Sequence, residues 1–413
     1  MKHHSNHKAR IDNPKNKNNY LAIGLIILAP SVRLMAPSLN TVILFVLVPV
    51  LFIWKIVTDR QALNRNCIKY YFTLIGWLLI TVFTSSDVQM SIVYMKTLGG
   101  GLLVSFIMYA IALEKLQNGI YILFSYILLL VTTLWYLWAN GELVGVDISS
   151  ERLNDELVNA NDIAYYLFYT ASSLTLLSFF FRGKRFWKIG LQVLILLLTI
   201  VVARITASRQ MLIIVVPYII ICIIYQSSDR IKIQNILPTI ATIFVILAMF
   251  GPMIKEFFAG SYMEERMGTD LSEDSRLGLL LESIRVGLNN PIFGVGPGTL
   301  VKYTSGSGFS HNSYAELFST SGLPALLIYL FMTIPFVIRN KRRYRTTRLP
   351  VFSFLFVTSV VWTIYNFLYV FYSNLWLISF YYLLMGISDS VYCKYKIIEE
   401  GRNIDENQIV SDR

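Results

Sequence analysis

Apolar runs of about twenty residues recur along almost the whole sequence and constrain its fold more than any other feature. A helix that crosses the hydrocarbon core of a bilayer needs about 20 predominantly apolar residues. The chain is 55% hydrophobic and only 15% charged, whereas soluble domains usually carry about a quarter charged residues. The sequence therefore predicts an all-α integral membrane protein and argues against a soluble enzyme.

About twelve of these runs are long enough to be membrane spans, although Arg33 and two prolines interrupt the first. They lie near residues 20–36, 38–57, 70–86, 97–113, 120–139, 161–181, 189–205, 209–225, 236–252, 314–338, 350–370 and 373–392. The chain then divides into five parts. They are a basic cytoplasmic tail (1–19), spans 1 to 9 (20–252), a long ordered extracytoplasmic loop (253–313), spans 10 to 12 (314–392) and a second cytoplasmic tail (393–413).

The distribution of charge predicts how these spans are oriented. Of the 36 basic residues, 26 fall on the side that holds both termini, together with 10 acidic residues; the opposite side holds 10 basic and 15 acidic residues. Lys and Arg concentrate in cytoplasmic loops, so we expect both termini in the cytoplasm. The net charge of +11 is then a signal of topology, and we expect no nucleic-acid partner.

The cysteines and the N-terminal segment predict no disulfide, zinc site or cleavable signal peptide. Cys67, Cys222 and Cys393 are widely spaced, so neither a disulfide framework nor a zinc site is expected. The polar first nineteen residues contain no pattern of a cleavable signal peptide.

The loop over 253–313 is where we look for chemistry, because loops of this length are usually functional or disordered. Within it, a capping segment at 270–275 precedes apolar residues at helical spacing, which predicts an amphipathic helix ending near Asn289. Pro291 and a glycine cluster at 294–298 follow. The cluster lacks the strand and Gly-Lys-Ser/Thr context of a nucleotide site. A tight turn is the favoured interpretation, and a direct contact between backbone and ligand is the alternative.

His311 and Glu316 stand where this loop re-enters the membrane. His311 is the only histidine outside the N-terminal tail, and a positioned imidazole can accept a proton from a hydroxyl near neutral pH. The alternative is an interfacial histidine that caps the helix or bonds a carbonyl. A carboxylate inside a span marks a functional site by default. Glu316 either orients His311 or pairs with an arginine, or it reaches out to water.

Four arginines on the same side suggest an anionic ligand, because guanidinium groups bind phosphate bidentately without a metal. They are Arg204, Arg209, Arg276 and Arg285. Nine residues of helix place Arg276 and Arg285 on opposite faces. One of the two is therefore expected to be solvated or paired, with Glu282 or Asp274 as partner. No carboxylate pair of the metal-binding or glycosidase type lies beside these residues, so we expect chemistry without a metal or cofactor.

Taken together, these segments resemble the signature loop of the bacterial O-antigen ligase/polymerase superfamily. The order, spacing and common placement of the segments carry the resemblance, which spans roughly residues 161–340. The matching segments are Asn161-Asp162-Ile163-Ala164, Thr206-Ala207-Ser208-Arg209, Arg276 with its leucine-rich helix, Asn290-Pro291-Ile292-Phe293-Gly294-Val295-Gly296-Pro297-Gly298, His311-Asn312-Ser313-Tyr314-Ala315-Glu316-Leu317 and Gly322-Leu323. The sequence departs from many relatives at Pro324, where they carry a second glycine.

The resemblance implies a glycosyltransferase with a GT-C-like helical fold in the bacterial cytoplasmic membrane. Such enzymes move a glycan from undecaprenyl diphosphate onto an acceptor glycan hydroxyl at the outer face. Carried over by position, Arg209 and Arg276 would bind the carrier diphosphate and His311 would engage the acceptor. Arg204 and Arg285 are not matched in this way and remain candidate substrate contacts on the residue pattern alone, beside the candidates Asn312, Tyr314 and Glu316. Membrane lipid, a flippase and a chain-length regulator would be the other partners.

Three activities remain open at this point. We favour a polymerase of capsule, exopolysaccharide or O-antigen, acting by direct displacement with inversion. A ligase that transfers finished glycan to the lipid A core is the alternative within the superfamily. A flippase or transporter is the alternative of another class, although such proteins place their charged sites near the midplane between symmetric halves, and no halves are evident here.

Overall fold

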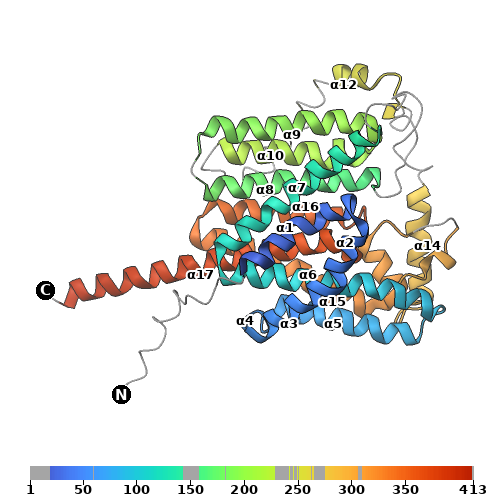
Figure 1. Ribbon diagram of the computed structural model, residues 1–413, viewed down its shortest axis with the longest axis horizontal. Coiled ribbons are helices and arrows are strands. Elements are labelled where there is room, and N and C mark those ends of the chain that lie inside the picture. The colour runs from blue at the N-terminus through green and yellow to red at the C-terminus, as the bar shows by residue number, and fades with distance from the viewer. Residues whose placement is uncertain are drawn as a thin grey trace.

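The computed structural model describes residues 19–58, 60–142, 158–181, 183–227, 251–261, 263–264, 275–305 and 309–411, with 241, 245 and 249. These residues form helices and no strand, so the predicted all-α class is confirmed for the described part of the chain. The main helices in Figure 1 are α1 Asn19–Met35, α2 Pro37–Val42, α3 Val48–Thr58, α4 Arg60–Leu63, α5 Asn66–Phe83, α6 Val88–Glu114, α7 Leu116–Ala139, α8 Ala160–Phe180, α9 Arg185–Thr206, α10 Val216–Ser227, α12 Gly251–Phe258, α14 Ser275–Asn289, α15 Ser313–Thr347, α16 Pro350–Tyr365 and α17 Leu375–Ser411. Single π- or 3-10 turns complete the set: η2 Ile43–Leu47, η3 Met211–Val215, η6 Leu300–Lys302 and η7 Phe371–Ser373.

Eight described helices are long and apolar enough to cross a membrane, and three shorter apolar helices accompany them. They coincide with eleven of the twelve predicted runs. These helices make the protein a multi-pass membrane protein. The remaining run, 236–252, lies largely outside the described residues, and the predicted count of twelve spans is therefore not confirmed. The tail at 1–18, most of the acidic segment at 140–160 and the predicted helix start at 270–274 also lie outside them.

Several helix ends differ from the predicted span ends, because hydropathy marks the edge of the bilayer and not the end of a helix. α6 begins nine residues before the predicted span, where the Asp87 side chain accepts a hydrogen bond from the Met90 amide (2.9 Å). α15 and α17 continue to Thr347 and Ser411 through polar sequence. α16 instead stops at Tyr365, which leaves residues 366–370 in a connection.

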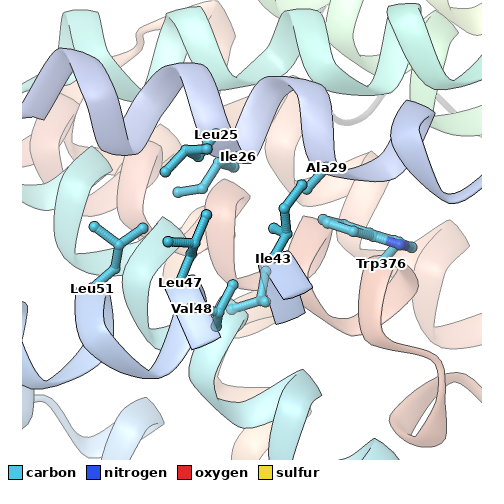
Figure 2. Close-up of a pocket in the computed structure, with 9 residues that line it drawn as sticks. Leu25, Ile26, Ala29, Ile43, Leu47, Val48, Leu51 and Trp376 are labelled. Carbon is cyan, nitrogen blue, oxygen red and sulfur yellow. The ribbon is translucent and has the colours of Figure 1, made fainter. Parts of the chain in front are cut away.

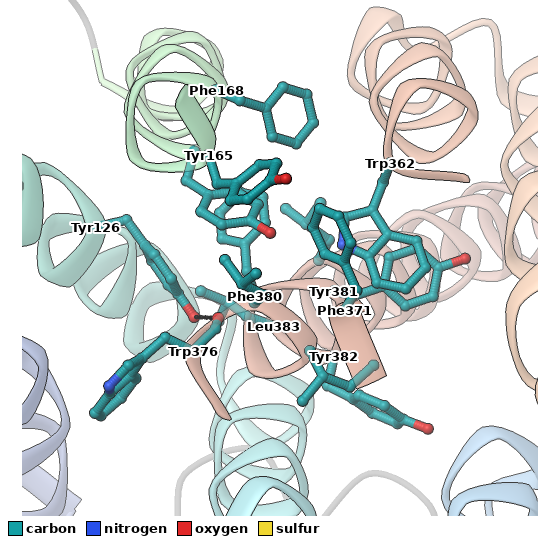
Figure 3. Packing of buried hydrophobic residues seen from close by; sticks show 14 of the residues in the cluster. Tyr126, Tyr165, Phe168, Trp362, Phe371, Trp376, Phe380, Tyr381, Tyr382 and Leu383 are labelled. Atoms are coloured by element: carbon teal, nitrogen blue, oxygen red, sulfur yellow. Dashed lines mark hydrogen bonds between the residues drawn. The ribbon is translucent and has the colours of Figure 1, made fainter. Parts of the chain in front are cut away.

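Aromatic side chains from α7, α8, α16 and α17 fill the centre of the bundle (Figure 3). Trp362 stacks on Tyr381 with ring centroids 4.0 Å apart. The Tyr126 hydroxyl donates to the carbonyl of Trp376 (3.3 Å). Helices in a bilayer gain little from the hydrophobic effect between them and associate through close packing and interhelical hydrogen bonds. This aromatic cluster therefore fixes how α17 sits among its neighbours.

Ion pairs join the helices near the ends that carry most of the basic residues. The buried Asp389 carboxylate of α17 accepts from Arg343 of α15 (2.5 Å) and from the Tyr109 hydroxyl of α6 (2.7 Å). Lys55 of α3 pairs with Glu114 of α6. A buried charge needs such a partner. These pairs hold the end of the bundle opposite to the one at which α15 begins.

Candidate active site at the start of helix α15

Asn312 caps the N-terminus of α15 and so fixes where the helix begins. Its side-chain Oδ1 accepts from the amides of Tyr314 (2.9 Å) and Ala315 (3.0 Å), as asparagine commonly does at this position. Its Nδ2 donates to the carbonyl of Phe367 (3.3 Å). Both polar ends of the predicted substrate contact Asn312 are thus engaged within the protein, and the residue orients the segment that carries His311.

His311 lies half-buried immediately before this cap, with its backbone in the left-handed region at φ 52°. Two contacts fix the preceding residue. The Ser310 amide donates to Glu316 Oε2 (2.8 Å), and the Ser310 hydroxyl donates to the carbonyl of Asn312 (2.8 Å). A non-glycine residue with positive φ persists only where its surroundings enforce it. These contacts supply that enforcement.

Glu316 is fully buried and turns toward the loop. The sequence left three roles open for Glu316: orienting His311, pairing with an arginine or reaching water. The hydrogen bond from Ser310 agrees with the first role, because Ser310 directly precedes His311. Its other oxygen, Oε1, has no hydrogen-bond partner among the described residues. The carboxylate does not reach out to water from the span.

Hydrogen bonds join the start of α15 to the connection between α16 and α17. The Ser313 amide donates to the carbonyl of Asn366 (2.8 Å), and the Ser313 hydroxyl donates to that of Tyr369 (2.8 Å). The Phe371 amide in turn donates to the Ser313 hydroxyl (2.8 Å). Sequence reasoning missed this connection because it placed residues up to 370 in a span. The only available signal was the polar pair Asn366 and Asn374 in an apolar region.

Arg209 follows a tight turn that is tied to the start of α8. Ala207 adopts a left-handed conformation at φ 49°, and the next residue, Ser208, donates through its hydroxyl to Oδ1 of Asn161 (3.1 Å). The two short sequence segments that resembled the superfamily are therefore in direct contact. Arg209 is half-buried beside this contact. Arg204, one turn earlier, lies over the Phe257 ring at 5.0 Å, in cation–π contact.

Arg276 and Arg285 lie on different faces of α14, as their spacing predicts. Arg276 is half-buried and lies within electrostatic range of the Tyr165 hydroxyl in α8. Arg285 is exposed. Glu282, a partner expected for one of the arginines, instead accepts hydrogen bonds from the amide (2.8 Å) and hydroxyl of Ser305. Those hydrogen bonds lower the pKa of Glu282 below its usual value.

Tyr165, whose hydroxyl lies within electrostatic range of Arg276, packs against the connection to which the start of α15 is bonded. Its ring contacts the rings of Tyr369 (4.9 Å between centroids) and Phe371 (5.1 Å), and these two residues bond to Ser313 as described above. Asn161, the contact of the Arg209 turn, lies one helical turn before Tyr165 on α8. The structure thus gathers the surroundings of Arg209, Arg276 and His311 around the connection between α16 and α17.

The glycine cluster forms a tight turn that docks against a kink in α15. The amides of Val295 and Gly296 donate to the carbonyls of Ser319 (3.0 Å) and Thr320 (2.8 Å). A side chain at Gly294 would place its Cβ 2.2 Å from the backbone of Thr320, and one at Gly322 would meet the carbonyl oxygen of Ile292 at 1.9 Å. Both glycines also have positive φ. Close packing between two backbones therefore explains why this turn is rich in glycine.

The same turn is held from its other side by the α5–α6 corner, which sequence reasoning did not connect with the site. Trp77 stacks on Phe293 (5.6 Å) and donates through Nε1 to the carbonyl of Ser321 (2.8 Å). The Ser91 hydroxyl donates to the carbonyl of Pro297 (2.8 Å). These partners are more than two hundred residues apart in the chain. No local sequence pattern could have paired them.

An apolar pocket elsewhere in the bundle contains none of the predicted site residues. Figure 2 shows it between α1, the η2–α3 segment and Trp376 of α17. Hydrophobic side chains alone line it: Leu25, Ile26, Ala29, Ile43, Leu47, Val48, Leu51, Val104 and Trp376. It offers no group for acid, base or phosphate chemistry.

A family model described as O-Antigen ligase matches residues 163–330. This range runs from the first turns of α8 into α15 and includes all four arginines, His311 and Glu316. No curated protein matches the chain.

Proposed function

We propose that this membrane protein, of which residues 163–330 match the family model described as O-Antigen ligase, is a surface-polysaccharide polymerase. It transfers glycan from undecaprenyl diphosphate onto an acceptor sugar hydroxyl at the outer face of the bacterial cytoplasmic membrane, with both termini cytoplasmic. The observation that carries the proposal is the gathering of the Arg209, Arg276 and His311 segments at one end of the helical bundle within the matched range. The same end contains the start of α15 and its buried carboxylate.

On the donor side, Arg209 and Arg276 bind the carrier diphosphate. Both are half-buried, so their charge is screened less by water than that of a surface arginine. A diphosphate is a good leaving group, and guanidinium groups stabilise the negative charge that develops on it as it departs. Arg204 and the exposed Arg285 are proposed as secondary contacts to the substrate.

On the acceptor side, His311 accepts the proton of the attacking hydroxyl. That oxygen forms a bond to the anomeric carbon, while the bond from the anomeric carbon to the carrier phosphate breaks. The diphosphate leaves with the electron pair, the proton resides on the imidazole, and the anomeric configuration inverts. Glu316 contributes by fixing Ser310 and hence the backbone of His311. Asn312 and Tyr314 complete this wall of the site, with the Tyr314 hydroxyl donating to the carbonyl of Thr363 (3.3 Å).

A reconstitution assay tests the proposal and separates it from the alternatives. Purified protein in vesicles receives a carrier-linked repeat unit, with or without a lipid A core acceptor. A polymerase makes longer carrier-linked chains with the repeat unit alone. A ligase acts only when the core acceptor is present and makes a core-linked product. A flippase moves the unit across the vesicle membrane without forming any glycosidic bond.

A further inference from the structure

The apolar side of α14 faces away from the protein. Four of its apolar residues are between 37% and 66% exposed, and they lie within about 60° of one another around the helix. They are Leu277, Leu281, Ile284 and Leu288, here called the leucine stripe. The face that packs on α15 is formed instead by small residues: Ser283 is fully buried, and Gly287 lies against the Phe318 ring.

A third, polar side of α14 completes the helix. Glu282, Arg285 and Asn289 follow the leucine stripe around the axis by about 60–130°, and Arg285 and Asn289 are exposed. Arg276 lies on the packed side with Ser283 and Gly287. The helix thus has one side against protein, one apolar side that is exposed among the described residues and one polar side.

Contacts at the C-terminal end of α14 set its depth in the bundle. The carbonyl of Pro291 accepts from the Leu323 amide (2.7 Å), and Leu323 lies ten residues into α15, about 15 Å from its start. Phe293 stacks on Trp77, which lies six residues before the end of α5, about 9 Å along that helix. The chain just after α14 therefore lies beside the membrane-spanning parts of α5 and α15 and not beyond their ends.

Further exposed apolar side chains follow the leucine stripe in α14 and occur along α15. Ile292 and Phe293 are exposed directly after α14, and Leu323, Leu327 and Phe331 are exposed along α15. Figure 1 shows α14 upright at one end of the bundle, whereas the long helices such as α5 and α6 run across the picture. An amphipathic helix in this orientation can bury its apolar side about 5–10 Å into the boundary between headgroups and acyl chains.

From this geometry we infer that α14 is an interfacial helix whose leucine stripe inserts among the lipid acyl chains of the leaflet at the site end of the bundle. Its polar side then faces water, and Arg276 on the packed side is held at the depth of the lipid headgroups. If the proposed function is correct, this placement meets the diphosphate of a lipid carrier where that group resides in a bilayer. The placement itself does not depend on the reaction.

Site-directed spin labelling tests the inference without reference to activity. The background is Cys393→Ser, because Cys393 is exposed whereas Cys67 and Cys222 are buried. Nitroxides are attached at Leu281→Cys and Leu288→Cys, with Asn289→Cys on the same helix as the matched control, in protein reconstituted into phospholipid nanodiscs. Collision rates with oxygen, which concentrates in lipid, and with a water-soluble nickel chelate are then measured.

We expect oxygen to relax the labels at 281 and 288 several-fold more than the nickel chelate does, and the reverse ratio at 289. Equal, high exposure of all three labels to the nickel chelate would show a helix in water and overturn the inference. Shielding of 281 and 288 from both reagents would also overturn it, because that result indicates a protein partner or a second copy on the stripe. A lipid-exposed stripe in a protein that makes no glycan would preserve the inference and refute only the proposed function.

Discussion

The carboxylate of Glu316 accepts a hydrogen bond from the backbone amide of Ser310, with 2.8 Å between Oε2 and N. The bond spans His311 and links the first turn of α15 to the loop before it. Because Ser310 is only 2% exposed, its amide has no access to water as a substitute partner. The position of the candidate base therefore depends on a carboxylate five residues further along the chain.

Two substitutions of Glu316 should distinguish the effect of its hydrogen bond on activity from the effect of its charge. Glu316→Gln retains a carbonyl oxygen for the Ser310 amide, whereas Glu316→Ala leaves that amide buried and unpaired at a cost of about 1–3 kcal/mol. We expect Glu316→Gln to keep most of the initial rate of glycan extension and Glu316→Ala to lose at least about tenfold. Rates are compared at equal amounts of folded protein. A loss in Glu316→Gln as large as in Glu316→Ala would show that the charge matters and not the hydrogen bond.

The two arginines of α14 provide a matched pair for the donor site. Arg276 is half-buried on the packed side of α14, whereas Arg285 is exposed on the polar side. Arg276→Ala should reduce extension by about a hundredfold or more, since loss of a preorganised charge at a developing anion costs roughly 2.7–4 kcal/mol. Arg285→Ala should change the rate by less than about tenfold. Similar losses in both variants would contradict the assignment of Arg276 as the main diphosphate ligand.

Glycine substitutions test whether the turn at 291–298 is held by close backbone packing. Gly322 has φ 79° and ψ 178°, a region that is essentially restricted to glycine, and its Cβ would clash with Ile292. Gly322→Ala should lower the free energy of unfolding by more than about 2 kcal/mol and reduce activity. Gly278→Ala on α14 is the control, because nothing lies within 4 Å of its added Cβ. Thermal unfolding in detergent measures both, and an unchanged melting temperature for Gly322→Ala would refute this packing.

The ion pair between Asp87 and Lys302 (2.7 Å) predicts a specific acid sensitivity. The Lys302 ammonium, with the Met90 amide, lowers the pKa of Asp87 below its ordinary 3.8. A carboxyl whose pKa is lower in the folded state stabilises the protein above its ordinary pKa, and this stabilisation is lost as the pH falls through the lower value. The melting temperature of the unmodified protein should fall as the pH drops through the pKa of Asp87. In Asp87→Asn the fall over this pH range should be smaller, because the variant has no carboxyl group there to protonate. An identical acid profile in the variant would contradict the prediction.

Much of the fold could be predicted because a membrane span is a local property. A run such as 120–139 is apolar enough to identify α7 without knowledge of its neighbours, and the end of α14 at Asn289 follows from Pro291 and the glycines after it. Helix ends in polar sequence could not be found in this way. α17 continues well past its apolar part, since intrahelical hydrogen bonds need no hydrophobic side chains.

The site was predictable in part for the same reason. His311 and Arg276 stand out by residue type and position, and the opposite exposure of Arg276 and Arg285 follows from helix geometry. The support from Trp77 and Ser91 could not be found, because these residues contact the glycine turn across more than two hundred positions. The direction of the leucine stripe was also hidden. Apolar spacing identifies one side of a helix, but it does not tell whether protein or lipid covers that side.

Counting the carrier released per bond formed is the most direct test of metal-independent, inverting transfer at Arg276 and His311. Purified protein in vesicles is given a carrier-linked repeat unit, and mass spectrometry follows both chain length and free undecaprenyl diphosphate. The unmodified protein should release one undecaprenyl diphosphate for each glycosidic bond, in the presence of a chelator, while His311→Ala and Arg276→Ala release it at least about a hundredfold more slowly at equal protein level. Normal chain growth in His311→Ala, or longer chains without released diphosphate, would contradict the proposed site and its chemistry.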